Sequence, residues 1–186
     1  MQEPGEAKRF LRAAMLADRL HRDPLAAGRA AAAKAPVSLQ IFKTVAGYRP
    51  VRGEIDPGPL MAALAAKGAA LCLPSARPGE VLGFHAWAPD HPLVRGAYGI
   101  EEPHQDAVRV MPDLIIVPMA AFDAAGHRLG YGAGHFDRTL EALRIGGGVF
   151  ALGLAYADHE VASLPAEVHD QKLDAVLTEK GYRAFP

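Results

Sequence analysis

Residues 112–140 read PDLIIVPMAAFDAAGHRLGYGAGHFDRTL, and this stretch decides the expected fold. It begins with Leu114–Val117, a short run rich in β-branched residues that Pro118 closes. A run that is apolar on both faces is typical of a central strand covered by helices on both sides. Farther along, Asp137–Leu143 carries leucines at helical spacing. We therefore expect a strand, a glycine-rich loop and a helix in succession.

The loop between this strand and this helix is rich in glycine. It carries four glycines within nine residues: Gly126, Gly130, Gly132 and Gly134. Such a loop before a helix lets backbone N–H groups converge on an anion, helped by the positive end of the helix. It is not a Rossmann fingerprint, because His135 stands where the third glycine would be, and it lacks the Gly-Lys-Ser/Thr of a Walker A loop. A flexible surface loop is the alternative interpretation.

Two residues beside this loop favour nucleotide phosphates as the anion. Arg128 precedes the loop, and arginine is a common phosphate partner. Asp137 follows the loop, and its carboxylate is a hard oxygen ligand suited to Mg²⁺. The combination predicts a site for a nucleotide and its metal ion.

The composition bounds the class of protein. The chain has 186 residues, half of them apolar, and a formal net charge of −1. This length suits one α/β domain, which we expect over residues 1–186. The charge gives no bias toward nucleic acid or membrane, and we find no run of about 18 apolar residues. The single cysteine, Cys72, is predicted to be a buried structural thiol. We therefore expect a cytoplasmic protein without nucleic-acid or membrane partners.

The N-terminal region is predicted to form two helices. Glu6–His21 has helical apolar spacing, and Asp23-Pro24 supplies an N-cap and an N1 proline for a second helix that ends near Lys34. Lys8 and Arg12 lie four residues apart, hence on one face, near the helix end where the macrodipole disfavours cations. Two interpretations stay open, a solvated basic face and a pair of cations presented to an anion.

Short apolar runs alternate with helical patterns along the rest of the chain. The predicted segments are: strand Thr44–Tyr48, helix Pro59–Lys67, strand Ala70–Leu73, strand or half-hairpin Val81–Trp87, strand Val149–Ala155, and strand Asp174–Thr178 with a short tail after it. Strand, helix, strand in this order is typical of a parallel sheet with helical crossovers. We expect an α/β fold, a three-layer sandwich with a mostly parallel sheet.

Several polar residues follow predicted strands or stand in loops. Glu54 lies just after the first strand, at the edge where α/β sheets bind ligands, although a loop glutamate is usually only solvated. Residues 158–160 (DHE) lack the spacing of a zinc helix, so we interpret His159 as a loop residue.

The words VPMAAFD and GHRLGYGAGHFDRTL resemble a pattern of the 5-formyltetrahydrofolate cyclo-ligase family, roughly VPG-x-x-FD followed by G-x-RLGYGGGYYDR. The resemblance continues, in the same order, through residues 43–56 (KTVAGYRPVRGEID), 98–103 (YGIEEP) and 164–179 (LPAEVHDQKLDAVLTE). It covers almost the whole chain. It implies the topology shared with ribose-phosphate isomerase and CoA-transferase domains. It also implies ATP- and Mg²⁺-dependent conversion of 5-formyltetrahydrofolate to 5,10-methenyltetrahydrofolate, ADP and phosphate. We expect the protein to be a monomer.

The resemblance further implies roles for individual residues. ATP would contact Lys8, Arg9, Arg12, Arg128, Leu129, Gly130, Tyr131, Gly132, Ala133, Gly134, His135 and Phe136. The folate would contact Arg12, Glu54, Tyr98, Tyr131 and His135. Mg²⁺ would be held by Asp137 and Asp174, although Asp174 could equally be a solvated residue at a strand edge. Arg128, His135 and Asp137 would carry the catalysis.

One departure from the family pattern bears on activity. His135-Phe136 stands where the family has Tyr-Tyr, and histidine can still donate a hydrogen bond whereas phenylalanine cannot. This leaves the alternative of a diverged family member that binds nucleotide or folate without ring closure. A sugar-phosphate or CoA-thioester enzyme of the same broad fold is a further alternative, which the EID and GYGAGHFD words do not match.

Overall fold

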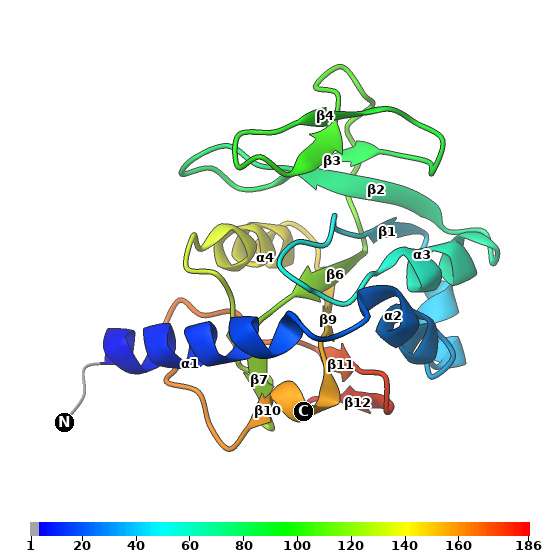
Figure 1. The fold of residues 1–186 in the computed structure, drawn as a ribbon. Coiled ribbons are helices and arrows are strands. Elements are labelled where there is room, and N and C mark those ends of the chain that lie inside the picture. The colour runs from blue at the N-terminus through cyan, green and yellow to red at the C-terminus, as the bar shows by residue number, and fades with distance from the viewer. Residues whose placement is uncertain (1–3) are drawn as a thin grey trace.

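The computed structural model describes residues 4–186, and a seven-stranded sheet lies at its centre (Figure 1). The strands are, in spatial order: β12 (Tyr182–Ala184), β11 (Ala175–Leu177), β9 (Phe150–Leu154), β6 (Leu114–Pro118), β1 (Thr44–Ala46), β2 (Ala70–Ser75) and β3 (Gly83–Ala86). The inner strands run parallel, while β3 and β12 pair antiparallel at the two edges. The mostly parallel sheet is confirmed. The prediction of only a short tail after the strand at 174–178 was wrong in part, because residues of this tail form the edge strand β12.

The central position predicted for Leu114–Val117 is confirmed. These residues form most of β6, which pairs with β1 on one side and β9 on the other. All four side chains are fully buried. Leu114 and Ile116 belong to the core on one face of the sheet, and Ile115 and Val117 to the core on the other. Both faces of the sheet are therefore covered, as an apolar run without alternation predicts.

Helices on the two faces of the sheet complete a three-layer sandwich. On one face lie α2 (Pro24–Ala32), the 3₁₀ helix η1 (Val37–Ile41) and α3 (Gly58–Ala65), packed through residues such as Leu60 and Leu64. The other face is covered by α4 (His135–Ile145), through Leu140 among others. The expected three-layer α/β fold is confirmed, and a single domain over residues 1–186 stays a prediction.

Helix α1 (Pro4–Arg19) lies outside this sandwich (Figure 1). Its Leu11 and Met15 pack on a small apolar cluster that includes Ala121, Leu129 and Leu164. Ala121 and Leu129 of that cluster belong to a second sheet of β8 (Arg128–Leu129), β7 (Ala121–Asp123) and β10 (Glu160–Val161). Helix α1 is thereby held against the segment that leads into the glycine-rich loop.

Two hairpins were not predicted. Strands β7 and β8 pair antiparallel, as do β4 (Leu93–Arg95) and β5 (Glu101–Pro103). Buried Asp123 fixes the first hairpin, since its carboxylate accepts the N–H groups of Ala125, His127 and Leu164 at 2.9–3.0 Å. These bonds use side-chain chemistry that a reading of apolar periodicity does not detect.

Local signals placed the helix ends well. The Asp23 side chain accepts the N–H groups of Leu25 and Ala26 at 3.0 Å, as predicted for an N-cap. A short 3₁₀ turn, η2 (Ala157–His159), contains His159, the residue that we interpreted as a loop histidine.

Cys72 is fully buried, and burial raises the pKa of its thiol to about 12, so the predicted structural thiol is confirmed. Among residues 4–186, no helix has both the length and the apolar character needed to cross a membrane.

Candidate functional site

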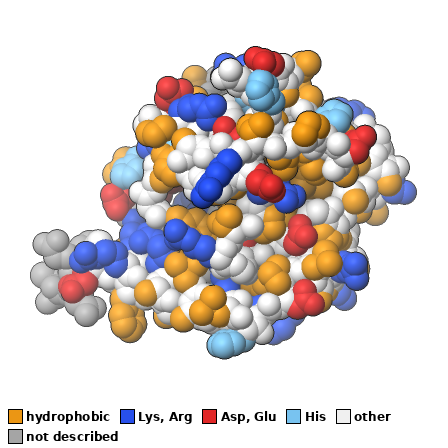
Figure 2. All heavy atoms as spheres, turned by 45° about the horizontal axis from the view of Figure 1, so that its top comes forward, with side chains coloured by type: hydrophobic (Ala, Val, Ile, Leu, Met, Phe, Trp, Pro, Cys, Tyr) orange, Lys and Arg blue, Asp and Glu red, His pale blue; other side chains and the backbone are white. Residues whose placement is uncertain are grey.

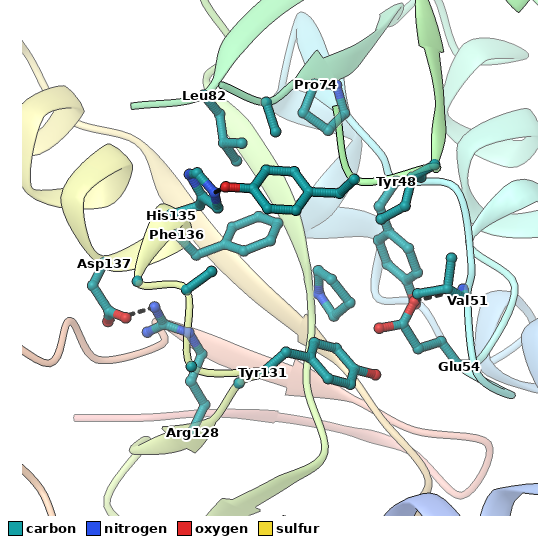
Figure 3. A pocket seen from close by; sticks show the side chains of 18 of the residues that line it. Tyr48, Val51, Glu54, Pro74, Leu82, Arg128, Tyr131, His135, Phe136 and Asp137 are labelled. Carbon is teal, nitrogen blue, oxygen red and sulfur yellow. Dashed lines mark hydrogen bonds and ion pairs between the residues drawn. The ribbon is translucent and has the colours of Figure 1, made fainter. Parts of the chain in front are cut away.

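A cavity of about 590 Å³ lies at the carboxyl edge of the parallel strands. Pro118 at the end of β6, Pro74 near the end of β2 and Tyr48 just after β1 line it (Figure 3). Helix α1, the β4–β5 hairpin and the first turn of α4 supply further walls. On the face drawn in Figure 2, lysine and arginine side chains gather where α1 meets the body of the protein. This is the edge at which ligands bind open α/β sheets.

The cavity brings together nearly all the residues expected to form the site. These are Lys8, Arg12, Glu54, Tyr98, Arg128, Leu129, Gly130, Tyr131, Gly132, Ala133, Gly134, His135, Phe136 and Asp137. Two expected residues are not part of its lining. Arg9 is exposed on α1. Asp174 lies elsewhere on the sheet.

The glycine loop, residues 130–134, forms one end of the cavity. Gly132 and Gly134 adopt left-handed backbone angles, φ 92° and 66°, which favour glycine. Gly134 is the N-cap of α4 and provides no side-chain cap, so the N–H groups of the first turn are left for another acceptor. Helix α4 begins at His135, two residues before the predicted start. Its uncapped, positive end is suited to an anion.

Arg12 connects helix α1 to the glycine loop. Its Nε donates to the Gly130 carbonyl at 2.7 Å. A Cβ built on Gly132 would lie 3.8 Å from the Arg12 Nη2. The guanidinium therefore lies beside the loop backbone, where it can share a bound anion with the N–H groups of the loop.

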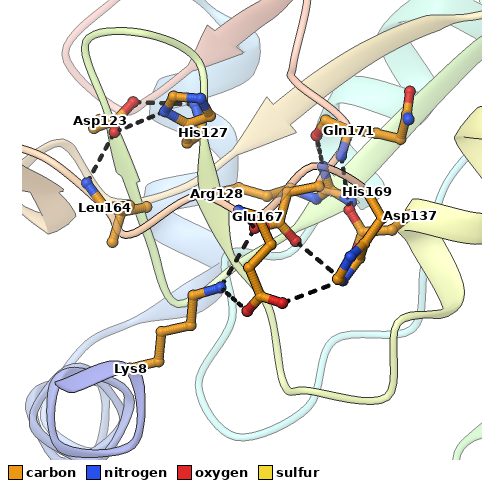
Figure 4. A network of polar contacts seen from close by, with 10 residues as sticks. Lys8, Asp123, His127, Arg128, Asp137, Leu164, Glu167, His169 and Gln171 are labelled. Carbon is orange, nitrogen blue, oxygen red and sulfur yellow. Dashed lines mark hydrogen bonds and ion pairs between the residues drawn. The ribbon is translucent and has the colours of Figure 1, made fainter. Parts of the chain in front are cut away.

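Lys8 lies at the same end, against residues of the C-terminal segment (Figure 4). Its Nζ contacts Glu167 Oε1 at 2.9 Å and Asp170 Oδ2 at 3.3 Å. Burial opposes the charged form of Lys8, but its hydrogen bond to Glu167 and the nearby Asp170 together raise its pKa. Lys8 is held by two carboxylates and is not a freely solvated surface cation.

Asp137 and Arg128 form an ion pair just behind the loop (Figures 3 and 4). The Arg128 Nη2 donates to Asp137 Oδ1 at 2.6 Å, and the same oxygen accepts the Gln171 N–H at 3.0 Å. Arg128 also donates to the Gln171 carbonyl. Burial lowers the pKa of Arg128, while the charges of Asp137 and Asp170 raise it. Both carboxylates therefore lie near one guanidinium.

Asp170 is a cavity residue that the sequence did not single out. Its Oδ2 accepts from Lys8 and from the Glu167 N–H, at 3.3 and 2.9 Å. Burial raises the pKa of Asp170, but these two contacts outweigh it and the pKa is lowered. Asp170 stands four residues before Asp174 in the quoted HDQKLD word, and spacing alone does not say which of the two faces the cavity.

These carboxylates suit a hard divalent cation. The hydrogen bonds of Asp137 use Oδ1 and those of Asp170 use Oδ2, so each keeps an oxygen without a hydrogen bond from the described residues. The described residues contain no group of three or more His, Cys, Asp or Glu side chains that could hold a metal ion. A Mg²⁺ ion here would take its remaining ligands from phosphate oxygens and water, as Mg²⁺ usually does.

Asp174 does not join Asp137, so the structure does not bring the expected pair of metal ligands together. Asp174 stands immediately before β11, at the amino edge of the sheet. Its Oδ2 accepts the Ala151 N–H at 2.7 Å and pairs with Arg144 at 3.0 Å. A carboxylate that satisfies a strand N–H at this edge has a structural explanation.

Glu54 lies at the opposite end of the cavity from the Arg128–Asp137 pair (Figure 3). It is 3% exposed, and its Oε2 accepts the Val51 N–H at 2.9 Å. Its Oε1 has no hydrogen-bond partner among the described residues. Burial raises the pKa of Glu54, and the hydroxyl of Tyr131 is the strongest influence that lowers it. A buried carboxylate with an unused oxygen is suited to a ligand that presents N–H groups.

His135 and Tyr98 both line the cavity and contact each other. The His135 Nδ1 lies 3.0 Å from the Glu80 carbonyl, and its Nε2 lies 2.9 Å from the Tyr98 hydroxyl. A carbonyl only accepts, so Nδ1 is the donor, and Nε2 of a neutral ring accepts from Tyr98. The rings cross edge to face with centroids 5.2 Å apart. His135 thus joins α4 to the segment between β4 and β5.

Comparisons with known proteins agree on one family. The sequence model of the 5-formyltetrahydrofolate cyclo-ligase family matches residues 4–179. A relative from Haemophilus influenzae named 5-formyltetrahydrofolate cyclo-ligase is 34% identical over 141 residues, which cover 73% of this chain and 75% of the relative. The relative of the same name from Escherichia coli K12 is 37% identical over 142 residues, covering 73% and 77%.

Solved structures give the same result for the fold. The structure of Aquifex aeolicus 5,10-methenyltetrahydrofolate synthetase superimposes with a TM-score of 0.79 at 31% identity, covering 95% of this chain and 92% of that one. A 5,10-methenyltetrahydrofolate synthetase from Mycoplasma pneumoniae gives a TM-score of 0.72 at 18% identity, covering 92% and 98%. At that lower identity the likeness concerns the fold alone.

Proposed function

The chain belongs to the 5-formyltetrahydrofolate cyclo-ligase family, and from that premise we propose that it converts 5-formyltetrahydrofolate to 5,10-methenyltetrahydrofolate with ATP, releasing ADP and phosphate. One observation carries the proposal. A single cavity joins an uncapped glycine loop flanked by cations to a buried carboxylate with an unused oxygen. Its two ends suit two different ligands, a polyphosphate and a heterocycle with N–H donors.

The chemistry explains why a cyclo-ligase needs both ends close together. The formyl oxygen is a poor leaving group, so it first takes the γ-phosphoryl group of ATP and ADP is released. N10 of the folate then attacks the formyl carbon and the C–N bond forms, N10 loses its proton, and the former formyl oxygen leaves in the phosphate, which can take that proton. The protein has to position the two reactants and neutralise charge, and the scheme requires no protein nucleophile.

In this proposal the ATP phosphates bind at the glycine loop. The N–H groups at the start of α4 and the Arg12 guanidinium beside Gly130 bind the phosphate oxygens. Lys8 adds positive charge from α1. Arg128, held by Asp137 and the Gln171 carbonyl, adds a buried positive charge behind the loop and fixes the orientation of Asp137.

Asp137 and Asp170 are the residues we propose to hold Mg²⁺, each through the oxygen that its hydrogen bonds leave free. When bound, the ion supplies positive charge that neutralises the phosphate oxygens during transfer. The first-turn position of Asp137 in α4 also favours its carboxylate form, since the helix dipole stabilises negative charge there.

The folate is proposed to bind at the Glu54 end. The carboxylate of Glu54 accepts the N–H groups of the pterin edge through its unused oxygen. The ring of Tyr98 lines the cavity, where it can pack on a flat heterocycle. We propose that His135, which stands at the first tyrosine of the family pattern, holds Tyr98 over the cavity through its Nε2, which lies 2.9 Å from the Tyr98 hydroxyl. No observation favours a family member without ring closure.

We also propose that the protein acts as a monomer in the cytoplasm. A buried thiol such as Cys72 is compatible with the reducing cytoplasm.

The activity can be tested by absorbance. Purified protein is mixed with 5-formyltetrahydrofolate, MgCl₂ and ATP, and the appearance of the methenyltetrahydrofolate band is followed over time. We expect the band to appear only when ATP and Mg²⁺ are both present. A protein that binds ATP and the folate but never produces the band would contradict ring closure. It would support the alternative of a diverged family member that binds its ligands without closing the ring.

A further inference from the structure

Arg19 is a buried cation that the proposed chemistry does not use. It lies at the last position of α1 and is 2% exposed. Its Nη1 donates to the Tyr131 hydroxyl at 2.6 Å, and its Nη2 donates to the Met119 carbonyl. Its Nε has no hydrogen-bond partner among the described residues. A buried guanidinium is costly to desolvate, so a position that keeps one calls for an explanation.

The loop that carries Glu54 rests directly on Arg19. Gly53, next to Glu54, has a left-handed φ of 72°. A Cβ built on Gly53 would lie 2.8 Å from the Arg19 Cβ and 2.9 Å from its carbonyl oxygen. No larger residue fits without displacing one of the two segments. Arg19 therefore contacts the Glu54 loop through its backbone and the glycine loop through Tyr131.

The groups around Glu54 leave Arg19 as its buried cationic neighbour. Tyr48 is buried, and its hydroxyl donates to the Ile55 carbonyl. Arg52 also lowers the pKa of Glu54, but its side chain is exposed to solvent. Tyr131 faces Glu54 with its hydroxyl (Figure 3). Because that hydroxyl accepts from Arg19, its own proton is free to point toward the Glu54 carboxylate.

We propose that Arg19 is a positioning residue for the folate site, which orients the Tyr131 hydroxyl toward the Glu54 carboxylate and supports the loop that carries Glu54. Arg19 acts through Tyr131 and the Gly53 contact, and it does not line the cavity. The inference rests on the proposed binding of the folate by Glu54. It also explains why α1, which carries Lys8 and Arg12 at the nucleotide end, is anchored at the folate end as well.

The test measures the affinity for 5-formyltetrahydrofolate without ATP, by titration calorimetry, from mildly acidic to mildly alkaline pH. In Arg19→Met we expect the affinity at neutral pH to fall by about tenfold or more, the effect of one charge-assisted contact. The pH below which binding weakens should rise by about one unit, because Glu54 loses a nearby positive charge. The affinity for ATP should change much less.

Two further variants separate positioning from packing. Arg19→Lys keeps the charge and should keep most of the wild-type pH profile. Arg22→Met removes a neighbouring arginine that pairs with Asp18 and Asp158 outside the cavity, and it should leave the profile unchanged. If Arg19→Met does not fold, Tyr131→Phe removes the same link and should shift the profile in the same direction.

The outcomes decide between distinct failures. A wild-type pH profile in Arg19→Met, or in Tyr131→Phe when the arginine variant does not fold, would overturn the role of Arg19. Equal weakening of ATP and folate binding in Arg19→Met, with no change in the profile, would reduce Arg19 to a packing residue. If the wild-type protein itself does not bind 5-formyltetrahydrofolate, it is the proposed function that fails.

Discussion

The two edges of the central sheet use carboxylates in opposite ways. At the carboxyl edge, Glu54, Asp137 and Asp170 line the cavity. At the amino edge, Asp113 and Asp174 stand immediately before β6 and β11 and accept backbone N–H groups of neighbouring segments. A place in the cavity lining, as opposed to hydrogen bonds to strand N–H groups, thus separates the carboxylates proposed to bind a ligand from those that stabilise the fold.

The amino-edge carboxylates bind backbone N–H groups of neighbouring strands. Asp113 Oδ2 accepts the Lys43 N–H at 2.8 Å, and its Oδ1 accepts the Thr44 N–H at 2.9 Å. Asp174 joins β11 to β9 through the Ala151 N–H and to α4 through Arg144. Both residues close strand ends whose N–H groups would otherwise lack acceptors.

The strongest test of the carboxyl edge is a substitution in the glycine loop. Gly132→Val places a β-branched side chain at φ 92°, beside Arg12, where the phosphates are proposed to bind. We expect ATP affinity to fall at least about 100-fold, measured by calorimetry, while the circular dichroism spectrum stays that of the wild type. Wild-type ATP affinity in this variant would move the phosphate site away from the loop.

Glu54→Gln tests the folate end with a change of charge and almost none of size. Losing a charge-assisted hydrogen bond costs about 1.5–3 kcal/mol, so the KM for 5-formyltetrahydrofolate should rise by about tenfold or more. The KM for ATP should stay close to the wild-type value. An equal rise in both constants would indicate a general disturbance of the cavity and contradict the assignment.

At the amino edge the expected loss is one of stability. Asp113→Ala removes the acceptor of two N–H groups at the start of β1, those of Lys43 and Thr44, which should lower the free energy of unfolding by about 1–3 kcal/mol. The melting temperature should fall by about 2–4 °C for each kcal/mol, while both KM values stay unchanged. Reduced ATP or folate affinity with an unchanged melting temperature would contradict the contrast between the edges.

The smallest expected effect is a pH dependence of stability away from both edges. Burial lowers the pKa of His159 below its usual 6.5, against the opposing hydrogen bond of Asp18. The unfolded chain therefore binds the proton more readily, and stability that is complete above about pH 6.5 is lost as the pH falls below it. Melting curves should show a decline of about 2 °C or more on acidification, which His159→Gln should reduce. An identical decline in the variant would assign it to other groups.

Much of the fold followed from local sequence signals. Apolar runs gave the parallel strands, the N-cap at Asp23 gave the start of α2, and the contiguous glycine motif gave one end of the cavity. Strands β7 (AFD), β8 (RL) and β12 (YRA) were missed because each contains a charged residue, whereas the short strands β1 (TVA) and β11 (AVL) contain none. Short strands of this kind have no periodicity of their own to detect.

The site was predicted less evenly, for a physical reason. Residues within one motif, such as residues 128–137, all line the cavity because they belong to one continuous loop and the helix start that follows it. Asp170 and Asp174 lie only four residues apart in the same quoted stretch. Asp170 lies in a loop that lines the cavity, whereas Asp174 immediately precedes strand β11. Arg19 gave no signal, since its role depends on Tyr131 and Gly53 from distant parts of the chain.

The most direct test of this account is the rate of methenyltetrahydrofolate formation, measured across a range of Mg²⁺ concentrations in Asp137→Asn and Asp174→Asn. Asparagine keeps the shape of each side chain and removes its charge. We expect Asp137→Asn to lose about 100-fold or more in rate at low Mg²⁺ and to recover part of it in excess Mg²⁺. Asp174→Asn should follow the wild-type dependence. Full activity of Asp137→Asn at low Mg²⁺, or a Mg²⁺ requirement raised in Asp174→Asn instead, would contradict the assignment of the metal to the carboxyl edge.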